Sequence, residues 1–178
     1  MSVSLLKEVV AHKVFIGIGS NIDRKQNISA AITALQKQFN ELQLSSVYET
    51  TAMGIKNTDN YYNLVVGFKT DLSPEKINTL LKKIEKRSGR RHKRACPLDL
   101  DLLLYDDLII HNDGLDIPRQ DIINYAYVAV PLAEIIGDQR HPETGNSFHE
   151  HGQSEHIVDQ VIKKIDCYIG ENYDHKSV

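Results

Sequence analysis

Two aspartates separated by a single leucine, Asp99 and Asp101, form the sharpest chemical feature of the sequence. Side chains alternate between the two faces of a β-strand, so a strand over residues 98–105 places both carboxylates on one face, with Cα atoms about 6.6 Å apart. Burial and mutual repulsion oppose ionisation of such a pair, which favours a nearby cation. Mg²⁺ is suitable because it binds one or two carboxylates together with water and phosphate oxygens. The alternative is a strand edge with two solvent-facing aspartates, and the spacing alone leaves both open.

A run rich in Lys and Arg lies directly upstream, over residues 82–94, with eight basic residues against the single Glu85. The basic residues at positions 82–87 are typical of a solvated helix face. Residues 90–94 lie between the expected helix end and the aspartates, where we expect contact with an anionic ligand. The basic loop and the acidic strand together predict a metal–nucleotide site. The sequence contains neither a Walker phosphate loop nor a complete dinucleotide fingerprint.

Tyr61 and Asn63 are two residues apart and therefore project to the same face of their expected strand. An aromatic ring beside an amide can stack on a flat heterocycle and hydrogen-bond to its edge. A tyrosine that simply packs in the sheet is the more common alternative.

The elements that must position these residues follow the order β-α-β-β-α-β. We expect strands at residues 14–18, 42–50, 61–70 and 98–105, the last turning into 108–110, and helices with apolar stripes at residues 28–39 and 73–89. A short helix is expected at residues 128–136, and a final helix capped by Ser154 with an inner face that runs to Ile169. This order predicts an α+β fold with a ferredoxin-like βαββαβ core, a C-terminal hairpin and extra helices.

Composition narrows the class of protein. The 178 residues fit one domain, with a core at about 14–136 and a C-terminal extension at 137–178. The net charge of −3, from 21 basic and 24 acidic side chains, argues against a dedicated nucleic-acid binder. Two cysteines without a CxxC pair indicate a reducing compartment, so we expect a cytoplasmic protein. No apolar run approaches the roughly 18 residues that cross a bilayer, so no membrane partner is expected.

Several motifs occur in a characteristic order between residues 14 and 136. They are FIGIGSN at 15–21, SVYET at 46–50 with Met53 and Gly54, the YYN at 61–63, Glu85 with Gly89 and Arg90, PLDLD at 97–101, and Ile117-Pro118 through Val130-Pro131-Leu132. In this order they resemble the 6-hydroxymethyl-7,8-dihydropterin pyrophosphokinase family. The resemblance implies an enzyme of folate biosynthesis that transfers a diphosphate from ATP to the hydroxymethyl oxygen of a pterin and releases AMP.

The resemblance also implies a role for individual residues. Asp99 and Asp101 would hold two Mg²⁺ ions that bridge the triphosphate, and with Arg90 they form the catalytic set. The residues expected at the pterin are Thr50, Met53, Tyr61, Asn63 and Tyr127, with the two tyrosines on either side of the ring. Those expected at ATP are Glu85, Arg90, Arg91, His92, Lys93 and Arg119. The implied partners are ATP and a pterin, with the chain a monomer or a weak homodimer.

This chain also departs from the family pattern. The segment between Arg90 and the aspartates is short and the chain has no tryptophan, while Cys96 and Tyr125 stand where arginines are common. Glu49 and Thr51 replace an arginine and a proline beside the pterin pocket, which leaves a related pterin open as the substrate. A paralogue that binds pterin or nucleotide without turnover is a further alternative, and an RNA-binding ferredoxin-like module is the weakest. For the tail histidines at positions 149, 151 and 156 we favour a structural role over metal binding.

Overall fold

An antiparallel sheet forms the centre of the computed structural model, which describes residues 11–51, 60–89, 96–112, 114–158, 160 and 162–166. Its strand order is β5-β1-β4-β3-β8, and β2 pairs with β4. The strands are β1 (His12–Ser20), β2 (Gln43–Leu44), β3 (Val47–Thr50), β4 (Tyr61–Thr70), β5 (Asp99–Tyr105) and β8 (Ile162–Ile165). With α1 between β1 and β2, and α2 between β4 and β5, this is the predicted ferredoxin-like arrangement.

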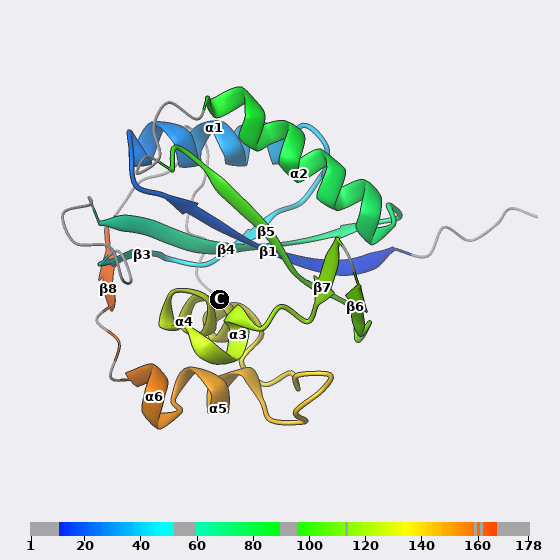
Figure 1. Ribbon diagram of the computed structural model, residues 1–178, viewed down its shortest axis with the longest axis vertical. Helices are drawn as coiled ribbons and strands as arrows, with labels where there is room; N and C mark the ends of the chain where they lie inside the picture. The colour runs from blue at the N-terminus through cyan, green and yellow to red at the C-terminus, as the bar shows by residue number, and fades with distance from the viewer. Residues whose placement is uncertain are drawn as a thin grey trace, which may run out of the picture.

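Helices α1 (Arg24–Gln36) and α2 (Pro74–Ser88) cover one face of the sheet (Figure 1). Both contribute apolar stripes at three- and four-residue spacing, as the sequence predicted. In α1 the buried stripe includes Ile28 and Leu35, and in α2 it includes Ile77 and Leu81. The helix α2 begins at its expected proline and is followed by Gly89, whose φ of 74° is unfavourable for other residues.

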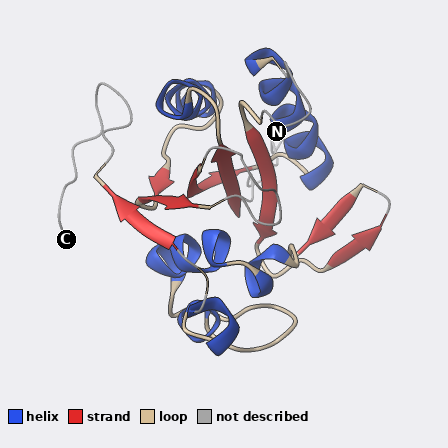
Figure 2. Ribbon diagram, turned by 60° about the vertical axis from the view of Figure 1, so that its left-hand side comes forward, coloured by secondary structure: helices blue, strands red, loops and turns tan. Residues whose placement is uncertain are grey.

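The opposite face of the sheet carries α3 (Asp121–Asn124) and α4 (Ala126–Ile136). Phe15 and Leu104 pack there against Leu132 of α4 in a second core. Helices α5 (Phe148–Gly152) and α6 (Glu155–Val158) lie beyond α4, so the helices on this side form two tiers below the sheet (Figure 1). Strands β6 (Ile110–Asn112) and β7 (Leu115–Ile117) form a separate hairpin beside the main sheet (Figure 2).

The end of the described chain differs from the predicted final helix. Helix α6 ends at Val158, and Ile162–Ile165 forms β8, which pairs antiparallel with β3 from Val47 to Thr50. The apolar spacing suited a helix, but pairing with the open edge of β3 satisfies main-chain groups that a helix there would leave exposed. Ile169 lies outside the described residues.

The strand expected over residues 42–50 is divided into β2 and β3. Between them, the hydroxyl of Ser45 accepts a hydrogen bond from the main-chain N–H of Val65 at 2.9 Å. The next residue, Ser46, donates from its N–H and its hydroxyl to Glu134 of α4, at 3.0 and 2.6 Å. These side-chain hydrogen bonds add to the main-chain bond from the Ser45 N–H to the Val65 carbonyl at 2.9 Å, and those of Ser46 tie β3 to α4. The strand after Tyr105 likewise begins later than expected, at Ile110.

None of the helices in the described part of the chain combines the length and the apolar composition needed to cross a membrane.

Candidate active site

Gly19 of β1 lies at the centre of the predicted site residues. It pairs with Asp99 of β5 on one side and with Asn63 of β4 on the other, and directly paired residues share a face of the sheet. A Cβ atom on Gly19 would lie 3.1 Å from Asn63 Oδ1 and 3.9 Å from both Asp99 Cβ and Tyr61 Cδ1. The absence of a side chain on Gly19 therefore brings a predicted metal-binding carboxylate and two predicted pterin residues together.

The two aspartates of β5 share the face that carries α3 and α4, as the alternation predicted. Leu98, Leu100 and Leu102 point to the opposite face and are buried in the core beneath α1 and α2. Asp99 is exposed, whereas Asp101 is half-buried, with 26% of its side chain accessible. Burial, followed by the charge of Asp99, raises the pKa of Asp101 to about 6, although Arg119 and Lys82 lower it. The surrounding positive charge is therefore insufficient to offset the cost of ionising Asp101.

Arg119 is positioned by a bulge in β5. The pairing of β1 with β5 shifts between Ile16 and Phe15, so that Leu103 is the extra residue. The carbonyl of Leu103 accepts a hydrogen bond from the main-chain N–H of Arg119 at 3.0 Å. The guanidinium then lies with Nη2 3.4 Å from Asp101 Oδ2, so Arg119 is next to the aspartates, and its contact with ATP stays a prediction.

Asp121 is a member of this cluster that the sequence analysis missed. Its carboxylate accepts a 2.8 Å hydrogen bond from Nε of Arg119, so the guanidinium lies between two acidic groups. The only signal in the sequence is the two-residue spacing of Arg119 and Asp121 at the start of a short helix, which is too common to indicate a site.

Thr50 and Asn63 form a buried polar pair at the ends of neighbouring strands. The side-chain amide of Asn63 donates to the hydroxyl of Thr50 at 2.8 Å, and both residues are less than 10% exposed. Asn63 Oδ1 faces Gly19. An amide and a hydroxyl held in this way can hydrogen-bond to the edge of a flat heterocycle without first losing side-chain freedom.

Tyr127 lies at the start of α4, packed against the core on the α3–α4 side of the sheet. Burial and the charge of Asp121 raise the pKa of its phenol well above the usual value, so the hydroxyl stays protonated. Its ring stacks on that of Tyr125, with centroids 5.1 Å apart and planes at 15°. Tyr125, which stands where the family pattern has an arginine, therefore supports the ring of Tyr127.

Glu85 of α2, another predicted ATP residue, holds the outer edge of β5. Its Oε1 accepts hydrogen bonds from the main-chain N–H of Leu100 at 2.7 Å and from Lys82 Nζ at 2.8 Å. The ammonium of Lys82 also lies 3.4 Å from the carbonyl of Leu100. Glu85 and Lys82 therefore satisfy the N–H and the carbonyl of Leu100, the residue between the two aspartates. The structure therefore gives Glu85 a positioning role, and its contact with ATP stays a prediction.

The segment that enters β5 is held by the Ser20–Asn21 clamp, which we define as the side chains and main chain of these two residues. Ser20 donates from its hydroxyl to the carbonyl of Pro97 at 2.6 Å. Asn21 Oδ1 accepts from the N–H of Cys96 at 2.7 Å, and its own N–H donates to the Cys96 carbonyl at 3.1 Å. The clamp fixes where the aspartate strand begins.

Comparison with known proteins identifies the family. Residues 15–137 match the model of the family described as 7,8-dihydro-6-hydroxymethylpterin-pyrophosphokinase (HPPK). The chain belongs to the HPPK family. It is 35% identical over 133 residues to the 2-amino-4-hydroxy-6-hydroxymethyldihydropteridine pyrophosphokinase of Aquifex aeolicus, covering 72% of this chain and 83% of the relative. The enzyme of the same name from Haemophilus influenzae is 37% identical over 130 residues, covering 70% and 81%. The function and enzyme class predicted from the sequence are thereby confirmed.

Two further matches involve longer proteins. The folic acid synthesis protein fol1 of Pneumocystis carinii is 33% identical over 172 residues, which is 93% of this chain but 22% of that protein. A solved structure of Plasmodium falciparum HPPK-DHPS superposes with a TM-score of 0.69 at 14% identity, covering 85% of this chain and 47% of the other. The chain thus spans about a fifth and about half of these two proteins, and the second match supports the fold alone.

Five predicted site residues of this HPPK chain lie outside the described residues: Met53, Arg90, Arg91, His92 and Lys93. We expected Glu49 to alter the wall of the pterin pocket, and this stays a prediction. Glu49 forms a 2.8 Å ion pair with Arg24 of α1, whose guanidinium lies 3.9 Å from the ring centroid of Tyr62. Because side chains alternate along β3, Glu49 faces away from the side that carries Thr50.

The tail histidines contact neighbouring parts of the HPPK chain. His151 Nε2 lies 2.7 Å from the hydroxyl of Thr144, and His156 Nε2 lies 2.6 Å from the carbonyl of Ile123. Within the described ranges there is no group of three His, Cys, Asp or Glu side chains that could hold a metal ion. These contacts agree with the structural role that we favoured.

Proposed function

We propose that this chain transfers a diphosphate from ATP to the hydroxymethyl oxygen of 6-hydroxymethyl-7,8-dihydropterin and releases AMP. The observation that supports the proposal is the convergence of Asp99, Asn63 and Tyr61 around Gly19. A carboxylate of the type that could bind a nucleotide-bound cation lies there next to groups suited to a flat heterocycle. In the transfer, the hydroxymethyl oxygen forms a bond to the β-phosphorus and its proton is released to solvent. The bond from that phosphorus to the bridging α–β oxygen breaks, and AMP leaves with the bridging oxygen.

The donor set fits Mg²⁺. Asp99 and Asp101 offer the one or two carboxylates that this ion takes from proteins, and burial followed by the charge of Asp99 raises the pKa of Asp101, a cost that a bound cation would offset. When bound, two such ions would neutralise triphosphate charge and fix its oxygens for in-line attack. In this proposal Asp99 and Asp101 both hold the ions, and Lys82 with Glu85 keeps the strand that carries them in place.

The remaining roles belong to groups that orient the two substrates. Thr50 and Asn63 hydrogen-bond to the pterin edge, Tyr61 and Tyr127 stack on its faces, and Met53 completes the pocket. Catalysis then comes mainly from holding the hydroxymethyl oxygen close to the β-phosphorus.

On the nucleotide side we propose that Arg119 contacts the phosphates, since its guanidinium already lies at the aspartates with part of its surface exposed. Arg90, Arg91, His92 and Lys93 are proposed to supply further positive charge to the triphosphate. Any contact of Glu85 with the nucleotide must leave its hydrogen bond to Leu100 intact. Losing that bond would leave the main-chain N–H of Leu100 unpaired.

The test is an assay of the full chain with ATP, MgCl₂ and 6-hydroxymethyl-7,8-dihydropterin, in which AMP and the pterin diphosphate are expected in equal amounts. Formation of ADP in place of AMP contradicts the proposal. A panel of pterins altered at the hydroxymethyl substituent or at the ring edge identifies the preferred substrate.

Calorimetric binding of ATP and pterin with no AMP formed would also contradict the proposal. We also propose a cytoplasmic location from the cysteine content, and a monomer or weak homodimer, which analytical ultracentrifugation measures directly.

A further inference from the structure

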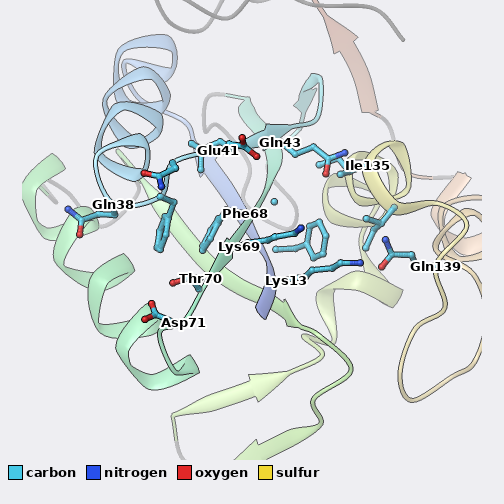
Figure 3. A pocket seen from close by; sticks show the side chains of 16 residues that line it. Lys13, Gln38, Glu41, Gln43, Phe68, Lys69, Thr70, Asp71, Ile135 and Gln139 are labelled. Carbon is cyan, nitrogen blue, oxygen red and sulfur yellow. The ribbon is translucent and has the colours of Figure 1, made fainter. Parts of the chain in front are cut away.

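A cavity of about 840 Å³ lies at the other end of the sheet, where β1 begins and β4 ends (Figure 3). Its walls come from the segment after α1, the start of β2 and the end of α4, and it shares no residue with the site around Gly19. Lys13 and Gly19 are six residues apart on β1, which is about 20 Å along a strand. The volume lies within the range of pockets that hold small organic molecules.

Two solvent-exposed lysines on neighbouring strands line this cavity. Lys13 of β1 is paired directly with Lys69 of β4, an arrangement that brings like charges close together and is destabilising when nothing lies between them. Figure 3 shows both side chains extended toward Ile135 and Gln139 and away from Asp71. Among the described residues neither ammonium group has an ion pair or hydrogen bond, whereas Lys82 and Lys164 do.

The surface next to the two lysines is apolar. Phe15 is two residues from Lys13 on the same face, and its ring covers Gly67, its partner on β4. A Cβ atom on Gly67 would lie 2.7 Å from Phe15 Cε1, so the ring keeps this position only because residue 67 is glycine. Ile135 and Ile136 add an apolar wall from α4.

The polar groups on the rim are arranged unevenly. The amides of Gln43 and Gln139 line the cavity with the lysines, while the carboxylates of Glu41 and Asp71 line other parts of its wall. In Figure 3, Asp71 lies on the side away from the lysine ammonium groups. A ligand with one anionic group fits the lysine end, whereas an anion extended along the cavity would meet the carboxylates.

We propose that this cavity is a second binding site, for a small organic anion whose carboxylate or phosphate group lies between Lys13 and Lys69 and whose apolar body lies against Phe15 and Ile135. Binding relieves the repulsion between the two ammonium groups, and Gln139 donates a further hydrogen bond. The site is independent of the transfer reaction and uses none of its residues.

The experiment is an amide NMR titration of the full ¹⁵N-labelled chain with phenyl phosphate, which combines a flat ring with an anionic group. The amide signals of Phe15, Gly67 and Gln139 should shift with saturation. Lys13→Gln and Lys69→Gln should each weaken this binding about tenfold, the effect of losing one charge-assisted hydrogen bond. Lys83→Gln, which removes an exposed lysine of α2, is the matched control and should bind as the unaltered chain does.

Titration with inorganic phosphate and with benzoate separates the contribution of the anionic group to binding from that of the apolar ring. Benzoate should shift the same signals, since it keeps the ring and one negative charge, and inorganic phosphate should bind more weakly because it has no apolar body. Shifts confined to signals near Gly19 and Asp99, or equal affinity in the two lysine variants and the control, would overturn the proposal. The amide shifts of the unaltered chain locate the binding site even if a variant is poorly folded.

Discussion

Two pairs of like charges lie on the same face of one sheet, at opposite ends of β1, and they differ in burial. Asp99 and Asp101 are neighbours on one strand, and burial contributes most to the raised pKa of Asp101. Lys13 and Lys69 face each other across two strands, both exposed to solvent. The comparison shows that burial raises the free-energy cost of a like-charge pair, whereas water screens part of the repulsion in an exposed pair.

The two ends of β1 carry side chains of different size on this face. On the face shared by the two pairs it presents Lys13 and Phe15 at one end and Gly17 and Gly19 at the other. The glycines leave space above the strand for the side chains of β4 and β5, and the larger residues fill that space at the lysine end. One strand thus carries two chemically different surfaces.

The largest expected effect separates the two pairs by activity. Asp99→Ala and Asp101→Ala should each lower the rate of AMP release by about 10³-fold or more, because the cation that neutralises the triphosphate loses a ligand. Lys13→Gln and Lys69→Gln should leave the rate within about twofold, because neither lysine lies at the transfer site. An Asp99→Ala variant with near-normal turnover would show that the acidic pair is not catalytic.

A smaller effect concerns stability and pH in the absence of Mg²⁺. The pKa of Asp101 is raised from 3.8 to about 6, so the folded chain binds more protons than the unfolded chain between these values, and stability falls as pH rises through them. Asp101→Asn removes this cost and should raise the free energy of unfolding by about 2–3 kcal/mol at pH 7.5.

Urea denaturation in EDTA measures the difference in the free energy of unfolding between Asp101→Asn and the unaltered chain. This difference should vanish below pH 4. Asp99→Asn is the control and should change stability less, because Asp99 is exposed. A less stable Asp101→Asn variant at pH 7.5 would mean that the contact with Arg119 outweighs burial and repulsion.

The smallest effect is expected at the lysine pair. Lys69→Gln should raise the free energy of unfolding by about 0.2–1 kcal/mol at low salt, since it removes a like charge opposite Lys13. The gain should fall when the salt concentration reaches about 1 M, because screening shortens the range of the repulsion. Thermal unfolding of Lys69→Gln beside Lys83→Gln measures it, and equal shifts in the two variants would refute a specific repulsion.

Features governed by local periodicity were predictable from the sequence. The alternation in LDLDL placed Asp99 and Asp101 on one face, and the apolar stripes placed α1 and α2 because burial of one face determines both patterns. The prediction of a long final helix was wrong because the spacing of Ile162 and Ile165 suits a helix as well as a strand. Only pairing with the distant edge of β3 favours the strand.

Features that depend on register between strands were not predictable. Glu49 and Thr50 are adjacent in sequence but face opposite sides of the sheet, so a register shift of one residue would exchange the contact with Arg24 for the contact with Asn63. The bulge at Leu103 that directs Arg119, and the pairing of Lys13 with Lys69, likewise arise from alignment between segments far apart in the chain.

The Ser20–Asn21 clamp makes the start of β5 independent of the length of the segment before it. Its hydrogen bonds hold Cys96 and Pro97 from the last residue of β1 and the residue after it, a different part of the chain. Insertions or deletions between residues 89 and 96 can therefore accumulate during evolution while the aspartates keep their register. The same independence offers protein engineers a place to graft new phosphate-binding sequences without redesigning the carboxylate pair.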